Sequence, residues 1–124
     1  MNIGLIGIGT VGGGTYQVLK ENAAEISNKS GIEIKITHVA DKNLKLAKET
    51  VEKETIIEED AFSLIENSSI DTIIELIGGT GIALDIVRKA LENGKHVVTA
   101  NKALIAMHGE ELFKIANKKN VLLA

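Results

Sequence analysis

Cysteine, proline and tryptophan are absent from this chain of 124 residues, and aromatic residues make up only 2% of it. Without cysteine the chain can form no disulfide, no thiolate metal site and no cysteine nucleophile. The three histidines show no metal-ligand spacing, so we expect no bound metal. The absence of proline argues against a hinge between domains, and the length fits one domain and hardly two.

Positive charge is also in short supply, since 14 lysine and arginine residues stand against 17 aspartate and glutamate residues. With no basic surplus and no basic stripe interleaved with aromatics, we expect no nucleic-acid partner. No apolar run reaches the length of a membrane span, so we expect no membrane partner. The sequence starts directly with strand-like residues and shows no cleavable leader. By elimination, we expect a cytoplasmic protein.

Hydrophobic residues make up 44% of the chain and are almost all aliphatic, which is typical of a parallel sheet packed against helices. Short apolar runs alternate with segments of helical periodicity. The runs predict strands over 2–7, 32–40, 71–77 and 96–99, and residues 121–124 begin a further strand. Residues 56–57 form either a very short strand or a buried turn. Helices are predicted from Val11, after a cap at Asn43, from a cap at Asp60 through Ile65, and over 82–91, 102–107 and 110–118. This alternation predicts an α/β fold, a Rossmann-type doubly wound parallel sheet.

Two details of this pattern bear on the organisation of the protein. One apolar stripe of the first helix is formed by Val11, Val18, Leu19, Ala23 and Ile26. Residues 121–124 are apolar and stop without a turn or a polar tail. We therefore expect the natural protein to continue beyond them and this chain to be a fragment of it.

The segment Gly7-Ile8-Gly9-Thr10-Val11-Gly12 has the GxGxxG form of a dinucleotide-binding loop. The motif alone is a weak signal, but here it follows a predicted strand and opens a predicted helix. Gly7 allows a tight turn, Gly9 lets a pyrophosphate approach the backbone, and Gly12 lets the helix pack closely on the sheet. The helix N-terminus offers free N–H groups to phosphate. The alternative is a glycine-rich turn that binds nothing. Two further glycines argue against it, because each costs the helix ~1 kcal/mol relative to alanine and a mere turn would gain nothing from that cost.

Asp41 follows the second predicted strand, where a carboxylate normally binds the ribose hydroxyls of the adenosine half. It lies further from Gly12 than the usual ~20 residues, and the polar segment before the second strand accounts for the excess. Asp41 would repel a ribose 2′-phosphate and so favours NAD, whereas Lys42 and Lys45 could pair with that phosphate and leave NADP open. The alternative for Asp41 is a loop carboxylate or a helix cap near Asn43.

Two later segments end the next two main strands: Glu75-Leu76-Ile77-Gly78-Gly79-Thr80 and His96-Val97-Val98-Thr99-Ala100-Asn101-Lys102-Ala103-Leu104. Together with the glycine loop they resemble homoserine dehydrogenase over essentially the whole chain, in the same order and with compatible spacing. The block at 99–104 is the specific part, since many dehydrogenases share the glycine loop. The resemblance implies that residues 1–124 form the NAD(P)-binding Rossmann domain of such an enzyme.

By this resemblance the complete enzyme would interconvert L-homoserine and L-aspartate 4-semialdehyde with NAD or NADP, in threonine, methionine and isoleucine synthesis. The family fold continues with a catalytic and dimerisation region, which supplies the substrate-binding carboxylates and a second catalytic lysine. We therefore expect the full protein to be a homodimer, and this fragment to bind cofactor without turning it over.

These segments all end strands, so their loops should meet at one crevice beyond the carboxyl edge of the sheet. Gly78 and Gly79 would let the nucleotide pass close to the backbone, and Thr99 and Asn101 could hydrogen-bond the nicotinamide side. The predicted cofactor-binding residues are Gly7, Ile8, Gly9, Thr10, Val11, Gly12, Asp41, Ile77, Gly78, Gly79, Thr99, Asn101 and Lys102.

Lys102 is the predicted catalytic residue. The resemblance places it beside the nicotinamide and assigns it to cofactor binding, to proton transfer, or to both. A lysine at a helix N-terminus meets the positive end of the helix dipole, which favours its neutral form and suits a proton shuttle. The alternative is a solvated surface lysine. Glu75 either contacts the cofactor region or bonds the backbone of a neighbouring loop, and we favour the second.

Two other functions stay open at this point. One is a different enzyme with a similar nucleotide domain, such as aspartate dehydrogenase, against which the block at 99–104 argues. The other is a non-catalytic NAD-sensing Rossmann module. Such a sensor would need only the adenosine half of the site, so Asn101 and Lys102 at the nicotinamide end favour an enzyme.

Overall fold

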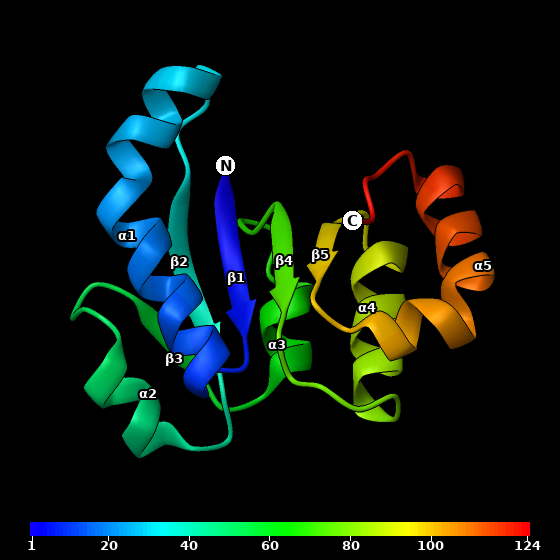
Figure 1. The fold of residues 1–124 in the computed structure, drawn as a ribbon, viewed down its shortest axis with the longest axis horizontal. Coiled ribbons are helices and arrows are strands. Elements are labelled where there is room, and N and C mark those ends of the chain that lie inside the picture. The colour runs from blue at the N-terminus through cyan, green and yellow to red at the C-terminus, as the bar shows by residue number, and fades with distance from the viewer.

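Five parallel strands form one sheet in the order β3-β2-β1-β4-β5 in the computed structural model, which describes all 124 residues (Figure 1). The strands are β1 (Asn2–Ile6), β2 (Lys35–Ala40), β3 (Ile56–Glu58), β4 (Thr72–Glu75) and β5 (His96–Thr99). The helices are α1 (Thr10–Ser30), α2 (Leu44–Thr50), α3 (Ala61–Glu66), α4 (Ile82–Glu92) and α5 (Lys102–Lys119). The predicted Rossmann-type parallel sheet is confirmed.

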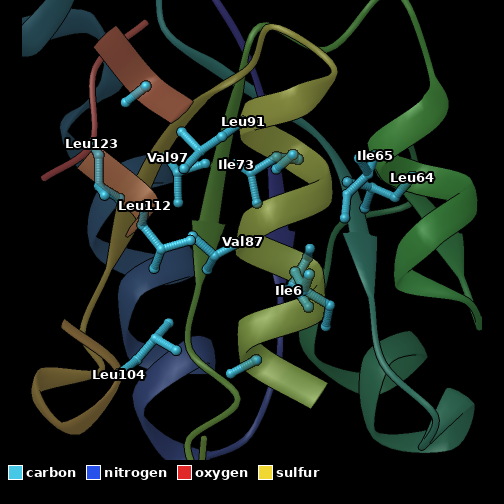
Figure 2. Packing of buried hydrophobic residues seen from close by; sticks show 14 of the residues in the cluster. Ile6, Leu64, Ile65, Ile73, Val87, Leu91, Val97, Leu104, Leu112 and Leu123 are labelled. Atoms are coloured by element: carbon cyan, nitrogen blue, oxygen red, sulfur yellow. The ribbon is translucent and has the colours of Figure 1, made fainter. Parts of the chain in front are cut away.

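Two apolar cores lie on opposite faces of the sheet. On one face, Ile3 and Leu5 of β1 pack with Tyr16 of α1 and Ala47 of α2. The other core holds Ile6 and the apolar faces of α3, α4 and α5 (Figure 2). Because successive residues of a strand point to opposite faces, Leu5 and Ile6 enter different cores. Helices thus pack on both faces of the sheet, as in parallel sheets generally, although Val98 of β5 stays 42% exposed.

The strand order reverses at β1, which has β2 on one side and β4 on the other. From β1 the chain moves outward through β2 to β3, then crosses to β4 and moves outward to β5. Open α/β sheets bind ligands in the crevice beyond the carboxyl ends of the strands at such a reversal. In Figure 1 these carboxyl ends, with the starts of α1, α4 and α5, lie toward the lower edge.

The second strand is shorter than predicted, because residues 32–34 lie outside the sheet. The helix α1 runs to Ser30 and ends at Gly31, which has a φ angle of 73°. Residues 32–34 lead the chain from the end of α1 back to the sheet, and Ile32 among them is 52% exposed. The strand therefore starts at Lys35. The short segment at 56–57 is a strand, β3, and not merely a turn.

The last two predicted helices are one continuous helix, α5, with Gly109 buried inside it. A methyl group at Gly109 would lie 3.3 Å from Cγ2 of Ile105, so the position is closely packed. A single glycine costs a helix only ~1 kcal/mol. Burial of Leu104, Leu112 and Ala116 in the core outweighs that cost and keeps α5 in one piece.

Residues 121–124 begin to pair with β5, as predicted for a further strand. Leu123 is bridged in parallel to Val97, and the N–H of Val97 donates to the Leu122 carbonyl at 2.9 Å. The N–H of Thr99 donates to the Ala124 carbonyl at 2.9 Å. A sixth strand position thus lies beside β5. None of the helices is long and apolar enough to pass through a lipid bilayer.

Lys95 holds together two turns at the amino edge of the sheet and is only 6% exposed. Its Nζ donates to the carbonyl oxygens of Asn67 and Ile70, both at 2.6 Å. Burial lowers the pKa of Lys95, and the negative charge of Asp71 opposes that effect. The side chain therefore joins the turn before β4 to the turn before β5 through two carbonyl acceptors.

We expect Lys95→Met to lower the free energy of unfolding by about 2 kcal/mol, because two carbonyls lose their donor. Urea denaturation followed by circular dichroism measures this loss, and Lys118→Met, on the exposed end of α5, should change it by less than about 0.5 kcal/mol. Because the pKa of Lys95 lies below its ordinary value of 10.5 in the folded protein, the unfolded chain binds this proton more tightly. The advantage of the wild type over Lys95→Met should therefore grow as the pH rises toward 10.5. A difference that stays constant or shrinks would contradict this.

Candidate functional site

The glycine loop joins β1 to α1 at the point where the strand order reverses. Gly7 has a φ angle of 98°, which glycine adopts without strain, and it turns the chain out of β1. A methyl group on Gly12 would lie 1.8 Å from the Gly7 carbonyl oxygen. A methyl group on Gly9 would meet no atom within 4 Å. The close approach at Gly12 is therefore to the backbone of the loop itself, and Gly9 borders open space.

The first turn of α1 has unpaired backbone donors. Gly9 is its N-cap residue and provides no side chain to accept them. The N–H of Gly13 is the first to be paired within the helix, with the Gly9 carbonyl at 2.7 Å. The preceding N–H groups of residues 10–12 have no partner in the protein, and they lie at the positive end of the dipole of a 21-residue helix. Such an end favours an anionic ligand.

Asp41 follows β2 and uses both carboxylate oxygens inside the protein. Its Oδ2 accepts from the N–H of Ile8 in the glycine loop at 2.8 Å, and its Oδ1 accepts from the N–H of Asn43 at 2.8 Å. Asn43 is the cap of α2, accepting from the N–H of Leu46 at 3.1 Å. Asp41 is thus a loop carboxylate that joins the glycine loop to the turn after β2, a link that its position in the sequence did not reveal. A carboxylate has about four acceptor positions, so two remain for a ligand.

Two hollows flank the glycine loop at the carboxyl edge of the sheet. The first has a volume of about 820 Å³ and is lined by Gly9, Asp41, Ile77 and apolar residues of α3 and α4. The second has a volume of about 590 Å³ and is lined by residues of α1, by Ile74 and Val98 of the sheet, and by Thr99 and Ala100 at the end of β5. Leu76 lines both. The site is therefore elongated across the sheet edge, with the glycine loop in the middle.

Two residues of the apolar stripe of α1, Val11 and Val18, do not face the core. They are 63% and 56% exposed, and both line the second hollow together with Leu19. The buried residues of α1 are Gly12 and Tyr16. A helical apolar stripe predicts a surface that avoids water, and such a surface can be the wall of a binding site as well as a core.

The loop after β4 carries Gly78 and Gly79, with φ angles of 87° and 74°. A methyl group on either would meet no atom within 4 Å, so a ligand could approach this backbone. Ile77 beside them is 41% exposed. The structure therefore places residues 77–79 at the carboxyl edge of the sheet, where Ile77 lines the first hollow.

Glu75, the last residue of β4, is fully buried, and both of its carboxylate oxygens are hydrogen-bonded. Its Oε1 accepts from the N–H of Ile77 at 2.8 Å, which confirms that it bonds the backbone of a neighbouring loop. Its Oε2 accepts from the Thr99 hydroxyl at 2.6 Å. The second bond was not predicted. It depends on the register that sets Glu75 opposite Thr99, which neither strand reveals by itself.

Thr99 and Asn101 join the turn after β5 to the loop after β4. The N–H of Asn101 donates to the Thr99 hydroxyl at 3.0 Å, and its Nδ2 donates to the Gly79 carbonyl oxygen. Its Oδ1 accepts from the N–H of Leu104 at 3.0 Å and so caps α5. Both residues lie at the carboxyl edge of the sheet, where Thr99 lines the second hollow, but their side chains are already engaged with the protein.

Lys102 is the first residue of α5 and is exposed. Its ammonium takes part in no ion pair and no hydrogen bond of the protein, whereas the neighbouring Asn101 is held on three sides. The backbone of Lys102 is therefore fixed at the crevice while its side chain is free. Its catalytic role stays a prediction.

Residues 7–124 match the family model described as homoserine dehydrogenase, NAD binding domain. This chain belongs to the homoserine dehydrogenase family. It is the nicotinamide dinucleotide-binding domain of that family, and the match starts at the first glycine of the loop. The resemblance inferred from the loop and from the block at 99–104 is confirmed.

Curated relatives carry the same name. Over 119 residues the chain is 50% identical to the homoserine dehydrogenase of Methylobacillus glycogenes. This match covers 96% of the chain and 29% of that protein. The chain is 47% identical over 123 residues to the homoserine dehydrogenase of Neisseria gonorrhoeae, covering 99% of this chain and 28% of that protein. The chain thus spans less than a third of the length of these relatives. Aspartate dehydrogenase and a sensing module are not favoured.

Solved structures agree with this assignment. A homoserine dehydrogenase from Thiobacillus denitrificans superposes with a TM-score of 0.93 at 42% identity, covering 100% of this chain and 28% of that one. A homoserine dehydrogenase from S. aureus superposes with a TM-score of 0.88 at 34% identity, covering 99% of this chain and 31% of that one. The fold of the homoserine dehydrogenase cofactor domain is therefore the fold of this chain.

Proposed function

We propose that this homoserine dehydrogenase domain holds NAD or NADP across the carboxyl edge of its sheet, with the pyrophosphate at the glycine loop. The observation that carries the proposal is the open space at Gly9, where a methyl group would meet no atom within 4 Å, next to the unpaired N–H groups of residues 10–12. Space and donors together fit a pyrophosphate. The first hollow, with Asp41, suits the adenosine half, and the second, with Thr99, suits the nicotinamide half.

The residues that would hold the cofactor are those at this edge. Ile8, Thr10 and Val11 belong to the loop and the first turn of α1, and Ile77, Gly78 and Gly79 to the loop after β4. Asn101 and Lys102 lie at the start of α5. The predicted set from Gly7 to Lys102 follows the ends of four neighbouring strands, β2, β1, β4 and β5, which supports one continuous site.

For the whole protein we propose the activity that the relatives' names state. In it, L-homoserine and L-aspartate 4-semialdehyde are interconverted with a nicotinamide cofactor, as a cytoplasmic step of threonine, methionine and isoleucine synthesis. Residues 1–124 supply the cofactor domain. The substrate-binding carboxylates, a second lysine and the dimer contact would come from the rest of the protein, since the matched relatives are far longer than this chain.

Lys102 is the residue of this chain that we propose to move a proton. When bound, the nicotinamide supplies or accepts the hydride that distinguishes the alcohol from the aldehyde. Lys102 follows Ala100, which lines the second hollow, by two residues, and its Nζ has no partner in the protein. An uncommitted amine at this end of the site can take the proton of a substrate hydroxyl and return it to water.

The preference between NAD and NADP is proposed to depend on Asp41. A ribose 2′-phosphate bound at the first hollow would meet the Asp41 carboxylate, whereas ribose hydroxyls could donate to its two remaining acceptor positions. We expect the wild-type chain to bind NADH more tightly than NADPH. In Asp41→Ala this preference should fall by about tenfold. Calorimetric titration of each variant with both cofactors measures the ratio of the two affinities.

The ratio separates recognition of the ribose from support of the loop. Loss of the Asp41 bond to Ile8 would disturb the glycine loop and weaken both cofactors alike, leaving the ratio unchanged. Glu49→Ala removes an exposed carboxylate on α2 and is the control for net charge, with no change expected in the ratio. If Asp41→Ala keeps the wild-type ratio, Asp41 does not recognise the ribose. Failure of the wild type to bind either cofactor would contradict the proposed function itself.

A further inference from the structure

Glu75 is the one fully buried acidic residue of the chain, and no cation compensates it. It is 0% exposed and takes part in none of the ion pairs. Burial of a carboxyl group is costly unless its oxygens are hydrogen-bonded. Both oxygens are bonded here, to the N–H of Ile77 and to the hydroxyl of Thr99. An apolar residue at this position would avoid the cost of burying a carboxyl group. The presence of Glu75 is therefore explained by what its two hydrogen bonds hold in place.

The two bonds of Glu75 are part of a longer network between two loops. The Thr99 hydroxyl donates its only proton to Glu75 and accepts from the N–H of Asn101. Asn101 donates to the Gly79 carbonyl oxygen, and the N–H of Ala100 donates to the Glu75 carbonyl at 3.3 Å. The loop after β4 is therefore held at its start and at its second glycine, and the turn before Lys102 is held by the same group of side chains.

This network uses other hydrogen bonds than those of Asp41, although Ile77, whose N–H donates to Glu75, also lines the first hollow. On the adenosine side of the site Asp41 accepts from Ile8 and Asn43, and neither Glu75 nor Thr99 takes part in those bonds. The second hollow contains Thr99 but not Asp41, and the first contains Asp41 but not Thr99. Each half of the elongated site thus has its own buried or half-buried acceptor that fixes the neighbouring backbone.

We propose that Glu75 and Thr99 are positioning residues for the nicotinamide half of the cofactor, and that they act by fixing the loop at 77–79 against the turn that carries Lys102. This rests on the proposed function. Gly78 and Gly79 have positive φ angles and no side chains, so this loop has little of its own to restrain it. Thr99 acts by holding the backbone, because its hydroxyl proton is committed to Glu75 and cannot be donated to a ligand.

The proposal predicts a selective loss of affinity. In the 124-residue chain, Thr99→Val removes the hydroxyl while keeping a β-branched side chain in β5. Glu75→Gln keeps the shape but replaces one of the two acceptor oxygens with an NH₂ group, which donates. We expect each to weaken binding of NADH by roughly three- to tenfold. Binding of ADP, which lacks the nicotinamide half, should stay within about twofold of the wild type. Thr99→Ser keeps the hydroxyl and should restore most of the NADH affinity.

Calorimetric titration with NADH and with ADP measures both quantities on one sample. Thr72→Val is the matched control, since it deletes a buried threonine hydroxyl at the opposite end of the sheet, where that hydroxyl donates its hydrogen bond to the Met1 sulfur. It should leave both affinities unchanged. An equal loss of affinity for NADH and for ADP in Thr99→Val, including a loss caused by misfolding, would overturn the proposal. Unchanged NADH affinity in both Thr99→Val and Glu75→Gln would also overturn it. If the wild type bound neither ligand, the proposed function would fail, and this inference with it.

Discussion

Gly12→Ala is expected to lower the free energy of unfolding by about 3 kcal/mol, because the added methyl group would lie 1.8 Å from the Gly7 carbonyl oxygen. The clashing atom is backbone and not the end of a flexible side chain. The glycine loop and the first turn of α1 would therefore have to move apart. Urea denaturation followed by circular dichroism at 222 nm measures the loss, since the chain has no tryptophan to report by fluorescence.

Gly9→Ala is the matched change in the same loop and should have the opposite profile. A methyl group there meets no atom within 4 Å, so we expect the free energy of unfolding to change by less than about 0.5 kcal/mol. The same methyl group would occupy the space proposed for the pyrophosphate and should reduce NADH affinity by about tenfold or more. Wild-type affinity in Gly9→Ala would show that the pyrophosphate lies elsewhere. Wild-type stability in Gly12→Ala would show that the loop is not closely packed.

Lys102→Met is expected to reduce the rate of homoserine oxidation by about 10²- to 10⁴-fold, which is the usual contribution of a general acid or base. The affinity for NADH should change by less than about threefold, because the ammonium makes no contact that shapes the site. The rate has to be measured on a form of the protein that includes the region its longer relatives possess. NADH affinity is measured on the same form by calorimetry.

Two further variants separate proton transfer from charge. Lys102→Arg keeps a positive charge at the start of α5 but does not give up its proton near neutral pH, so it should not restore the rate. Lys118→Met removes a lysine from the far, exposed end of the same helix and should leave the rate unchanged. Equal losses of rate and of NADH affinity in Lys102→Met would make Lys102 a binding residue only.

Features that depend on a few neighbouring residues were predictable from the sequence. The turn at Gly7, the closeness at Gly12 and the open space at Gly9 all follow from the spacing of one motif, because the reason for each glycine lies within the loop. The caps at Asn43 and Asp60 were predictable for the same reason, since each accepts from a backbone N–H within three residues.

Features that depend on how distant segments meet were not predictable. The bond from Thr99 to Glu75 requires the register of β4 against β5. The bond from Ile8 to Asp41 requires the glycine loop and the turn after β2 to lie side by side. The exposure of Val11 depends on which part of the sheet α1 leaves uncovered. The apolar periodicity of the helix alone does not reveal this.

Binding of a nicotinamide dinucleotide at the carboxyl edge is tested most directly by an NMR titration of the 124-residue chain with NADH. Saturable shift changes are expected at the backbone amides of residues 9–12, at Asp41, and at residues 77–79 and 99–102. The amides around Lys95 and residues 67–70, at the opposite edge, should not move. Shift changes centred on that opposite edge, or none at saturating NADH, would contradict the assignment of the site.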